Sequence, residues 1–257
     1  MNEVSFDQHF LKNEKILEFI SECIGNISKH KVIEIGGGRG ALTKYIIEKN
    51  PKEFVCVEID EKMIEQLVLI FESNNYSLIH ENVLDYLKSL KQGEVNVLVG
   101  NIPYSITQQL IVQLFFLVPQ KVVFLQPHST TKTLMNNETK QAQLLNALYS
   151  ISCEKVVNGD NFEPLAHTQS SIMKLELKDK SSLLKKELFL IGLTKRYNQT
   201  FYNAVVYSLA EVLEVGKKEI KKKLEDQSIL FPEEKLNVVS NEDFNNLVDK
   251  VDFFFNK

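Results

Sequence analysis

Three scarcities narrow the classes of protein to which this chain of 257 residues can belong. It has no run of 18 or more apolar residues, as a membrane-spanning helix would need, and its first residues lack the basic and then apolar pattern of a secretion signal. Its only cysteines, Cys23, Cys56 and Cys153, are far apart and lie among apolar residues, and its five histidines show no metal-ligand spacing. We therefore expect a cytoplasmic protein with free thiols and no metal site.

Arginine is scarce too. Only Arg39 and Arg196 are arginines among the 30 basic residues, so contacts to phosphate groups would depend mostly on lysine, which is a point charge without a bidentate fork. The net charge of −4 argues mildly against a nucleic-acid partner, although its distribution matters more than its total. The lysine-rich stretch 217–223 is as compatible with RNA contact as with a solvated helix face.

Glycine is sparse as well, yet four of the ten glycines fall within residues 36–40. The β-branched run 32–35 before them is typical of a buried strand, and the stretch 41–47 after them is typical of a helix. Glycines at such a junction let a ligand approach the main chain closely, and we expect Gly36, Gly38 and Gly40 to expose their N–H groups. Glycine at every second position after Glu34 differs from the dinucleotide fingerprint G-x-G-x-x-G.

Short apolar strands alternate with amphipathic helices from residue 31 to residue 126. This rhythm predicts an α/β fold with a mostly parallel sheet that helices cover on both faces. Ligands of such sheets bind beyond the carboxyl ends of the strands, where Gly36, Glu58 and Asn101 would meet. The predicted strands are 31–36, 53–58, 77–80, 95–100 and 121–126, and the predicted helices are 41–49, 61–71, 83–90 and 107–117.

The last part of the chain has a different pattern. A helix near 140–149 and strands at 150–157 and 171–177 precede the best linker candidate, 178–182, and everything beyond it is helical in pattern. We therefore expect one domain over residues 1–180 and a small helical domain over residues 181–257.

Three motifs in order carry a resemblance to a known family. The glycine loop, the acidic strand end Val57-Glu58-Ile59-Asp60 and the tetrapeptide Asn101-Ile102-Pro103-Tyr104 resemble those of S-adenosylmethionine-dependent methyltransferases that act on the exocyclic amine of adenine. With Gln8-His9-Phe10-Leu11 near the start, the chain is similar to the ribosomal RNA adenine N6,N6-dimethyltransferases. The resemblance implies a Rossmann-like methyltransferase sheet, S-adenosylmethionine as methyl donor, an RNA-binding role for residues 181–257 and a monomer.

The resemblance also implies a set of donor-binding residues. Glu58 is expected to accept hydrogen bonds from both ribose hydroxyls, Glu34 to order the glycine loop, and Asn82, with Val83 beside it, to replace the family's aspartate that contacts the donor's adenine. Gln8 and Phe10 belong to a segment that closes over the donor, whereas Asp60 is expected to cap a helix instead. The donor set is Gln8, Phe10, Glu34, Gly36, Gly38, Glu58, Asn82, Val83 and Asn101.

The catalytic set expected from the resemblance is Asn101, Pro103, Tyr104 and Phe162. Adenine N6 is a poor nucleophile, and a site helps it by offering acceptors to the amine hydrogens as positive charge develops on nitrogen. The Asn101 carbonyl and a backbone carbonyl at Ile102 or Pro103 are the candidates. Tyr104 offers a face on which an unpaired base can stack, and Phe162 would clamp that base from the other side.

Two segments depart from the family pattern. Residues 126–132 keep only Gln126 and Lys132 of a basic motif, and residues 162–170 keep Phe162, Pro164 and Ser170. The leading hypothesis is dimethylation of adenine in small-subunit ribosomal RNA or a pre-ribosomal particle, supported by family-like segments at 195–204 and 231–244. The alternatives are a large-subunit methyltransferase that confers macrolide resistance, and a non-catalytic family member acting as an RNA-binding assembly or transcription factor.

Overall fold

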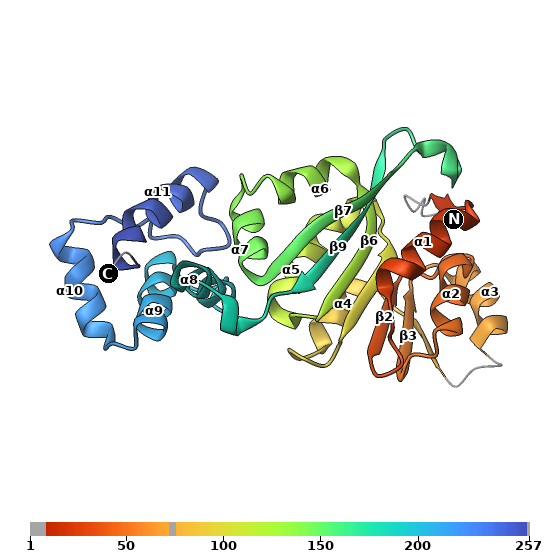
Figure 1. The fold of residues 1–257 in the computed structure, drawn as a ribbon, viewed down its shortest axis with the longest axis horizontal. Coiled ribbons are helices and arrows are strands. Elements are labelled where there is room, and N and C mark those ends of the chain that lie inside the picture. Colours follow the sequence, from red (N-terminus) through yellow and green to blue (C-terminus); the bar gives the residue numbers. More distant parts are fainter. Residues whose placement is uncertain (1–8, 72–75, 256–257) are drawn as a thin grey trace. The chain divides into compact units, whose positions relative to one another are not determined.

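The computed structural model describes residues 9–71 and 76–255 (Figure 1). These residues form two compact units, each with its own core. The first contains the described residues up to Lys132 together with Ser150–Leu177, and the second contains Thr133–Tyr149 and the described residues from Lys178 onward. None of the helices within the described ranges has the length and apolar character needed to cross a bilayer.

A seven-stranded sheet with the strand order β4-β3-β2-β5-β6-β9-β7 organises the first unit. Neighbouring strands from β4 to β6 pair in parallel, and β9 runs antiparallel to β6. This confirms the predicted α/β fold with a mostly parallel sheet. The strands are β2 (Lys31–Ile35), β3 (Glu53–Glu58), β4 (Ser77–His80), β5 (Val97–Asn101), β6 (Lys121–Pro127), β7 (Tyr149–Val157) and β9 (Ser170–Leu177).

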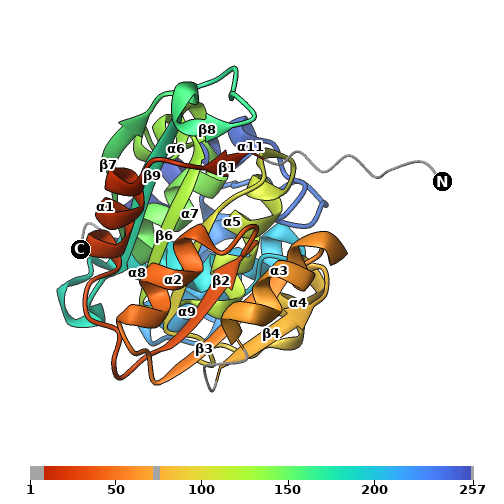
Figure 2. The ribbon, with the colours of Figure 1, turned by 90° about the vertical axis from the view of Figure 1, so that its right-hand side faces the viewer.

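Helices bury the apolar side chains of this sheet on both faces. Val32 and Val99 belong to a core shared with α1 and α2, which lie against each other (Figure 2). Ile33 and Leu98, whose side chains alternate onto the opposite face, are also fully buried. The helices of this unit are α1 (Glu14–Ile24), α2 (Ala41–Glu48), α3 (Glu61–Phe71), α4 (Val83–Ser89), α5 (Thr107–Leu117) and most of α6 (His128–Met135).

A two-stranded ribbon is the main feature that the sequence did not indicate. Strand β1 (Phe10–Leu11) pairs antiparallel with β8 (Phe162–Glu163), so that Phe10 lies opposite Glu163 and Leu11 opposite Phe162. Helix α1 begins only after this ribbon, where the Asn13 side chain caps it by accepting from the Lys15 N–H at 3.1 Å. The ribbon therefore joins two segments about 150 residues apart in sequence.

The second unit is a helical assembly around an aromatic core. Phe189, Phe201 and Phe244 are completely buried, and the rings of Phe201 and Phe244 stack with their centroids 6.1 Å apart. The helices are α7 (Lys140–Leu148), α8 (Lys185–Thr194), α9 (Phe201–Leu213), α10 (Lys217–Asp226) and α11 (Asn241–Val251). Helix α7 precedes the predicted linker 178–182 in sequence, yet its contacts assign it to this unit.

A buried lysine ties α7 to a turn of the second unit. The Lys140 side chain is 3% exposed, and its Nζ donates to the carbonyls of Leu236 at 2.7 Å, Asn237 at 3.1 Å and Val239 at 2.6 Å. Burial lowers the pKa of Lys140 to about 8. The ammonium group thus donates to three carbonyls, two of which belong to the buried residues Leu236 and Val239.

Substituting this lysine should destabilise the second unit. We expect Lys140→Met to lower the free energy of unfolding by about 3 kcal/mol, because the apolar replacement leaves buried carbonyls without a donor. Urea denaturation followed by circular dichroism measures the change. The exposed Lys218→Met is the matched control and should shift the midpoint little. Equal shifts for the two variants would contradict a stabilising role for the Lys140 contacts.

Candidate functional site

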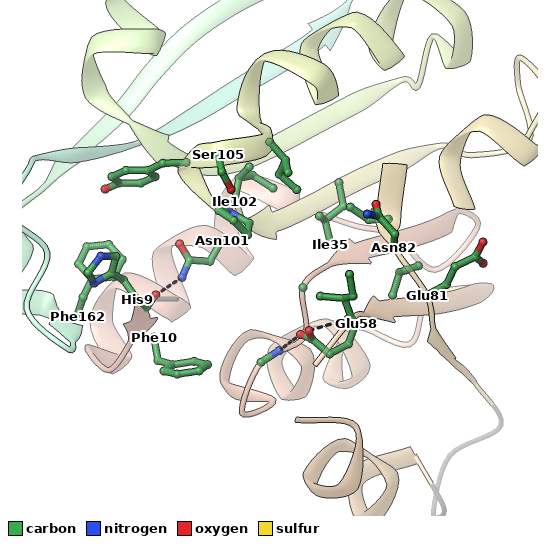
Figure 3. A pocket seen from close by; sticks show the side chains of 18 residues that line it. His9, Phe10, Ile35, Glu58, Glu81, Asn82, Asn101, Ile102, Ser105 and Phe162 are labelled. Carbon is green, nitrogen blue, oxygen red and sulfur yellow. Dashed lines mark hydrogen bonds between the residues drawn. The ribbon is translucent and has the colours of Figure 1, made fainter. Parts of the chain in front are cut away.

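The carboxyl ends of β2, β3 and β5 meet at a cavity of about 270 Å³ (Figure 3). Ten of the residues singled out from the sequence line it: Phe10, Gly36, Gly38, Glu58, Asn82, Val83, Asn101, Pro103, Tyr104 and Phe162. Residues that the sequence did not single out also contribute, among them His9, Ile59 and Glu81. Of the remaining two candidates, Glu34 is not part of the wall, and Gln8 lies outside the described residues.

The glycine loop is shaped by backbone conformation. Gly36 has a φ of +71°, which disfavours any other residue, and a side-chain carbon there would point into open space. At Gly38 (φ +52°) a Cβ would lie 3.1 Å from the Phe10 ring. The expectation that the loop exposes its N–H groups is wrong, because those of Gly36, Gly38 and Gly40 donate to Val57 O, Glu58 Oε2 and Gly37 O. The loop contributes room and shape instead.

Glu58 ends β3 with a carboxylate that the backbone holds in place. Its Oε1 accepts from the N–H groups of Ile59 at 2.8 Å and Asp60 at 2.9 Å, and its Oε2 accepts from Gly38 N–H at 2.9 Å (Figure 3). The side chain is only 5% exposed, yet it lines the cavity. A carboxylate has about four lone-pair positions, so acceptor capacity remains on Oε2. Asp60 itself caps α3, as expected, by accepting from Lys62 N–H at 2.9 Å.

Glu34 lies beneath the loop rather than in the cavity wall. It is 1% exposed, and Thr43 Oγ1 donates to its Oε2 at 2.7 Å. Burial raises the pKa of Glu34 to about 8, against hydrogen bonds from Thr43 and Cys56 that lower it, while the nearby Glu58 carboxylate raises it further. Glu34 therefore links β2 to α2 as a protonated, hydrogen-bonded carboxyl at neutral pH.

The protonation of Glu34 predicts a pH-dependent stability. Because the folded protein keeps a proton that the unfolded chain loses near its ordinary pKa of 4.5, the unfolding free energy should fall as pH rises from about 5 to about 8. Over this pH range the unfolding free energy of the wild type should fall by about 3 kcal/mol more than that of Glu34→Gln. Urea denaturation at each pH measures both. The exposed Glu61→Gln should keep the wild-type slope. A Glu34→Gln variant with that same slope would contradict the burial argument.

Asn101 ends β5 with an amide whose orientation is set by the N-terminal segment. Its Nδ2 donates to the backbone carbonyl of His9 at 2.7 Å (Figure 3). His9 is held in turn, because its Nδ1 lies 3.0 Å from Pro164 O and β1 follows it directly. Since an amide carries its donor and acceptor on opposite branches, this bond reserves Oδ1 as the acceptor at the cavity.

The aromatic candidates differ in exposure. Tyr104 is partly exposed, and its hydroxyl lies 2.6 Å from Oγ of the buried Ser170, which restrains the ring at the cavity wall. Phe162 is 2% exposed and packs in the core with Leu11. Phe162 therefore lines the cavity as an almost completely buried side chain, and its clamping role stays a prediction.

Asn82 serves locally as a helix cap. Its Oδ1 accepts from Leu84 N–H at 2.9 Å at the start of α4, and the residue is exposed at the cavity. Ile59, 41% exposed, and Val83, 8% exposed, add apolar surface to the same wall. The cavity thus combines a carboxylate, apolar walls and an oriented amide acceptor, which suits a polar ligand with a planar ring. Nowhere in residues 9–71 and 76–255 do three potential metal-ligating His, Cys, Asp or Glu side chains gather.

Comparison with known proteins relates this chain to enzymes that methylate ribosomal RNA. The family model for ribosomal RNA adenine dimethylases matches residues 1–250. The ribosomal RNA small subunit methyltransferase A of Mesomycoplasma hyopneumoniae is 30% identical over 79% of this chain and 80% of its own length. The protein of the same name from Blochmanniella pennsylvanica is 27% identical over 66% of this chain and 67% of its own.

Two solved structures are similar in fold over nearly the whole chain. A dimethyladenosine transferase from Plasmodium falciparum has a TM-score of 0.62 and 21% identity, covering 96% of this chain and 98% of that one. The 23S rRNA methyltransferase ErmE has a TM-score of 0.61 and 17% identity, covering 95% and 99%. At these identities the similarity shows the fold alone.

Proposed function

The chain belongs to the ribosomal RNA adenine dimethylase family, and from this premise we propose that it transfers methyl groups from S-adenosylmethionine to N6 of adenine in small-subunit ribosomal RNA. One observation carries the proposal: the cavity holds the Glu58 carboxylate and the oriented Asn101 amide together. Its curated relatives, named as small subunit methyltransferases, favour that subunit over the large one.

The residues present suit the methyl donor. Glu58 Oε2 retains acceptor capacity for a ribose hydroxyl, while Ile59 and Val83 supply apolar surface for an adenine ring. The open space at Gly36 leaves room for the remainder of the methyl donor. When bound there, S-adenosylmethionine supplies a methyl group activated by the positive charge on its sulfur. Binding of both ribose hydroxyls by Glu58 stays a prediction.

The chain's own catalytic contribution is the placement of acceptors. Positive charge develops on the amine nitrogen during transfer, so an acceptor facing its hydrogens stabilises the transition state more than the ground state. Asn101 Oδ1 is such an acceptor, because the bond from Nδ2 to His9 O prevents the amide from turning its donor toward the amine. Tyr104 provides a ring that Ser170 restrains, on which the unpaired base stacks.

Features of the second unit support an RNA partner. Lys217 Nζ lies 3.6 Å from the centroid of the Tyr207 ring, and Lys221 Nζ lies 5.8 Å from that of Tyr202. Lysines interleaved with tyrosines along α9 and α10 form the kind of surface that binds phosphates and unstacked bases. RNA binding by residues 181–257, a monomeric state and a cytoplasmic location stay predictions.

Labelled methyl transfer tests the proposed function. Unmodified small ribosomal particles are incubated with the protein and S-adenosylmethionine carrying a labelled methyl group, and the separated RNAs are digested to nucleosides. We expect label as dimethyladenosine in small-subunit RNA. Label only in large-subunit RNA would show that the large subunit is the substrate instead. Absence of label despite measurable donor binding would refute catalysis.

A further inference from the structure

Arg39, the exposed arginine of the glycine loop, contacts both strands of the β1–β8 ribbon. Its guanidinium carbon lies 4.5 Å from the centroid of the Phe10 ring, and its Nη1 lies 3.7 Å from Glu163 Oε2. Phe10 and Glu163 lie directly opposite each other in the ribbon. Opposed side chains of an antiparallel pair project from the same face. One guanidinium therefore bridges the two strands at a single position.

The backbone that carries Arg39 is held in place by its neighbour. Gly38 N–H donates to Glu58 Oε2 at 2.9 Å, so the loop is fixed to the end of β3 directly before Arg39. A Cβ at Gly38 would lie 3.1 Å from the Phe10 ring, which shows that the loop and the ribbon already lie close together there. Arg39 thus reaches from an anchored loop to the ribbon.

The ribbon and the glycine loop supply different walls of the cavity. Phe10 and Phe162, one from each strand of the ribbon, line one wall, whereas Gly38 and Glu58 line another (Figure 3). The ribbon has only two residues in each strand, which is too few for a pairing that is stable by itself. Its place at the cavity therefore depends on side-chain contacts, and the Arg39 bridge is the contact that reaches the glycine loop.

We propose that Arg39 is a positioning residue that ties the ribbon to the glycine loop and so slows release of the methyl donor from the cavity. The inference rests on the proposed function, which places S-adenosylmethionine between these two walls. A planar guanidinium can lie over an aromatic ring and face a carboxylate at the same time. The ion pair with Glu163 is exposed and contributes little alone, so the two contacts act together.

Arg39→Gln tests the inference by removing the charge. We expect the dissociation rate of S-adenosylmethionine, measured by surface plasmon resonance, to rise about fivefold, which corresponds to about 1 kcal/mol. The kcat for methyl transfer at saturating donor should stay within about twofold of wild type, because Asn101 and Glu58 keep their contacts. Lys44→Gln makes the same change of charge at an exposed position of α2 and should keep the wild-type dissociation rate.

A double-mutant cycle with Glu163→Gln separates the bridge from other effects of the substitution. If Arg39 acts through Glu163, the double variant should release the donor no faster than Arg39→Gln alone. Independent, additive effects of the two substitutions would overturn the inference. So would an Arg39→Gln variant that releases the donor as slowly as Lys44→Gln.

Hydrogen exchange reports on the ribbon in the absence of any donor. Lys12 N–H donates to Asn161 O at 3.0 Å directly after β1, and its exchange rate should rise about fivefold in Arg39→Gln. An unchanged exchange rate would contradict the tie between loop and ribbon. Wild-type protein that binds the donor but transfers no methyl group would overturn the proposed function, and the dissociation rates would still decide this inference. Wild-type protein that binds no donor would overturn both.

Discussion

Asn101→Ala is expected to lower the rate of methyl transfer to RNA by about a hundred- to a thousand-fold, the usual effect of removing one preorganised polar group from a transition state. The alanine cannot accept an amine hydrogen, and it also releases the carbonyl of His9, to which the amide now donates at 2.7 Å. Affinity for S-adenosylmethionine should stay within about threefold, because the Glu58 side of the cavity keeps its contacts. Single-turnover transfer and calorimetry measure the two effects separately.

Ser105→Ala is the matched control for this variant. Ser105 lines the same cavity and is exposed, and its hydroxyl makes no hydrogen bond among the described residues. Its loss should leave the transfer rate nearly unchanged. If Asn101→Ala transfers methyl groups as fast as Ser105→Ala, the amide is not the acceptor, and the His9 contact would be purely structural.

Glu58→Ala is expected to weaken binding of S-adenosylmethionine about a hundredfold. Hydrogen bonds to a charged group contribute about 1.5–3 kcal/mol each, and the variant loses the ribose acceptor together with the bond that holds Gly38. The N–H groups of Ile59 and Asp60 would also lose their acceptor. The transfer rate at saturating donor should change less than the affinity, because the Asn101 side of the cavity is intact.

Glu81→Ala controls for the loss of a carboxylate at the same cavity. Glu81 lines the wall but is exposed, so its removal should change the dissociation constant about twofold at most. Isothermal titration calorimetry measures the dissociation constant of S-adenosylmethionine for Glu58→Ala and Glu81→Ala. Circular dichroism verifies that each variant is folded. Unchanged affinity in Glu58→Ala would remove this residue from the donor site.

Much of the fold was predictable because its signals are local. Short β-branched runs bounded by polar residues or glycines define β2 and β3, whose structural limits lie within a residue of the predicted ones. The predicted strand 95–100 and the observed Val97–Asn101 differ more, because the strand end is decided by pairing with β6. Placement of Gly36, Glu58 and Asn101 in one cavity followed from the parallel topology itself.

The errors concern groups whose partners are distant in sequence. The short ribbon of β1 and β8 has too few residues to show a periodic pattern. The glycine loop was expected to expose its N–H groups, but Glu58 Oε2, 20 residues away, accepts one of them. Glu34 was not expected to be buried, but hydrogen bonds from Thr43 and Cys56 hold it outside the cavity wall, and its role toward the donor stays a prediction.

The sequence by itself determined the fold class, the family and most of the residues around the cavity, because hydrophobic periodicity and short motifs are properties of neighbouring residues. Only the tertiary structure decided which atoms of those residues are free to act. Asn101 donates to a carbonyl 92 residues away, and Ile102 N–H reaches Leu125 O only because β5 and β6 pair in parallel. Hydrogen bonds are short and directional, so the availability of a donor or acceptor depends on the folded arrangement around it.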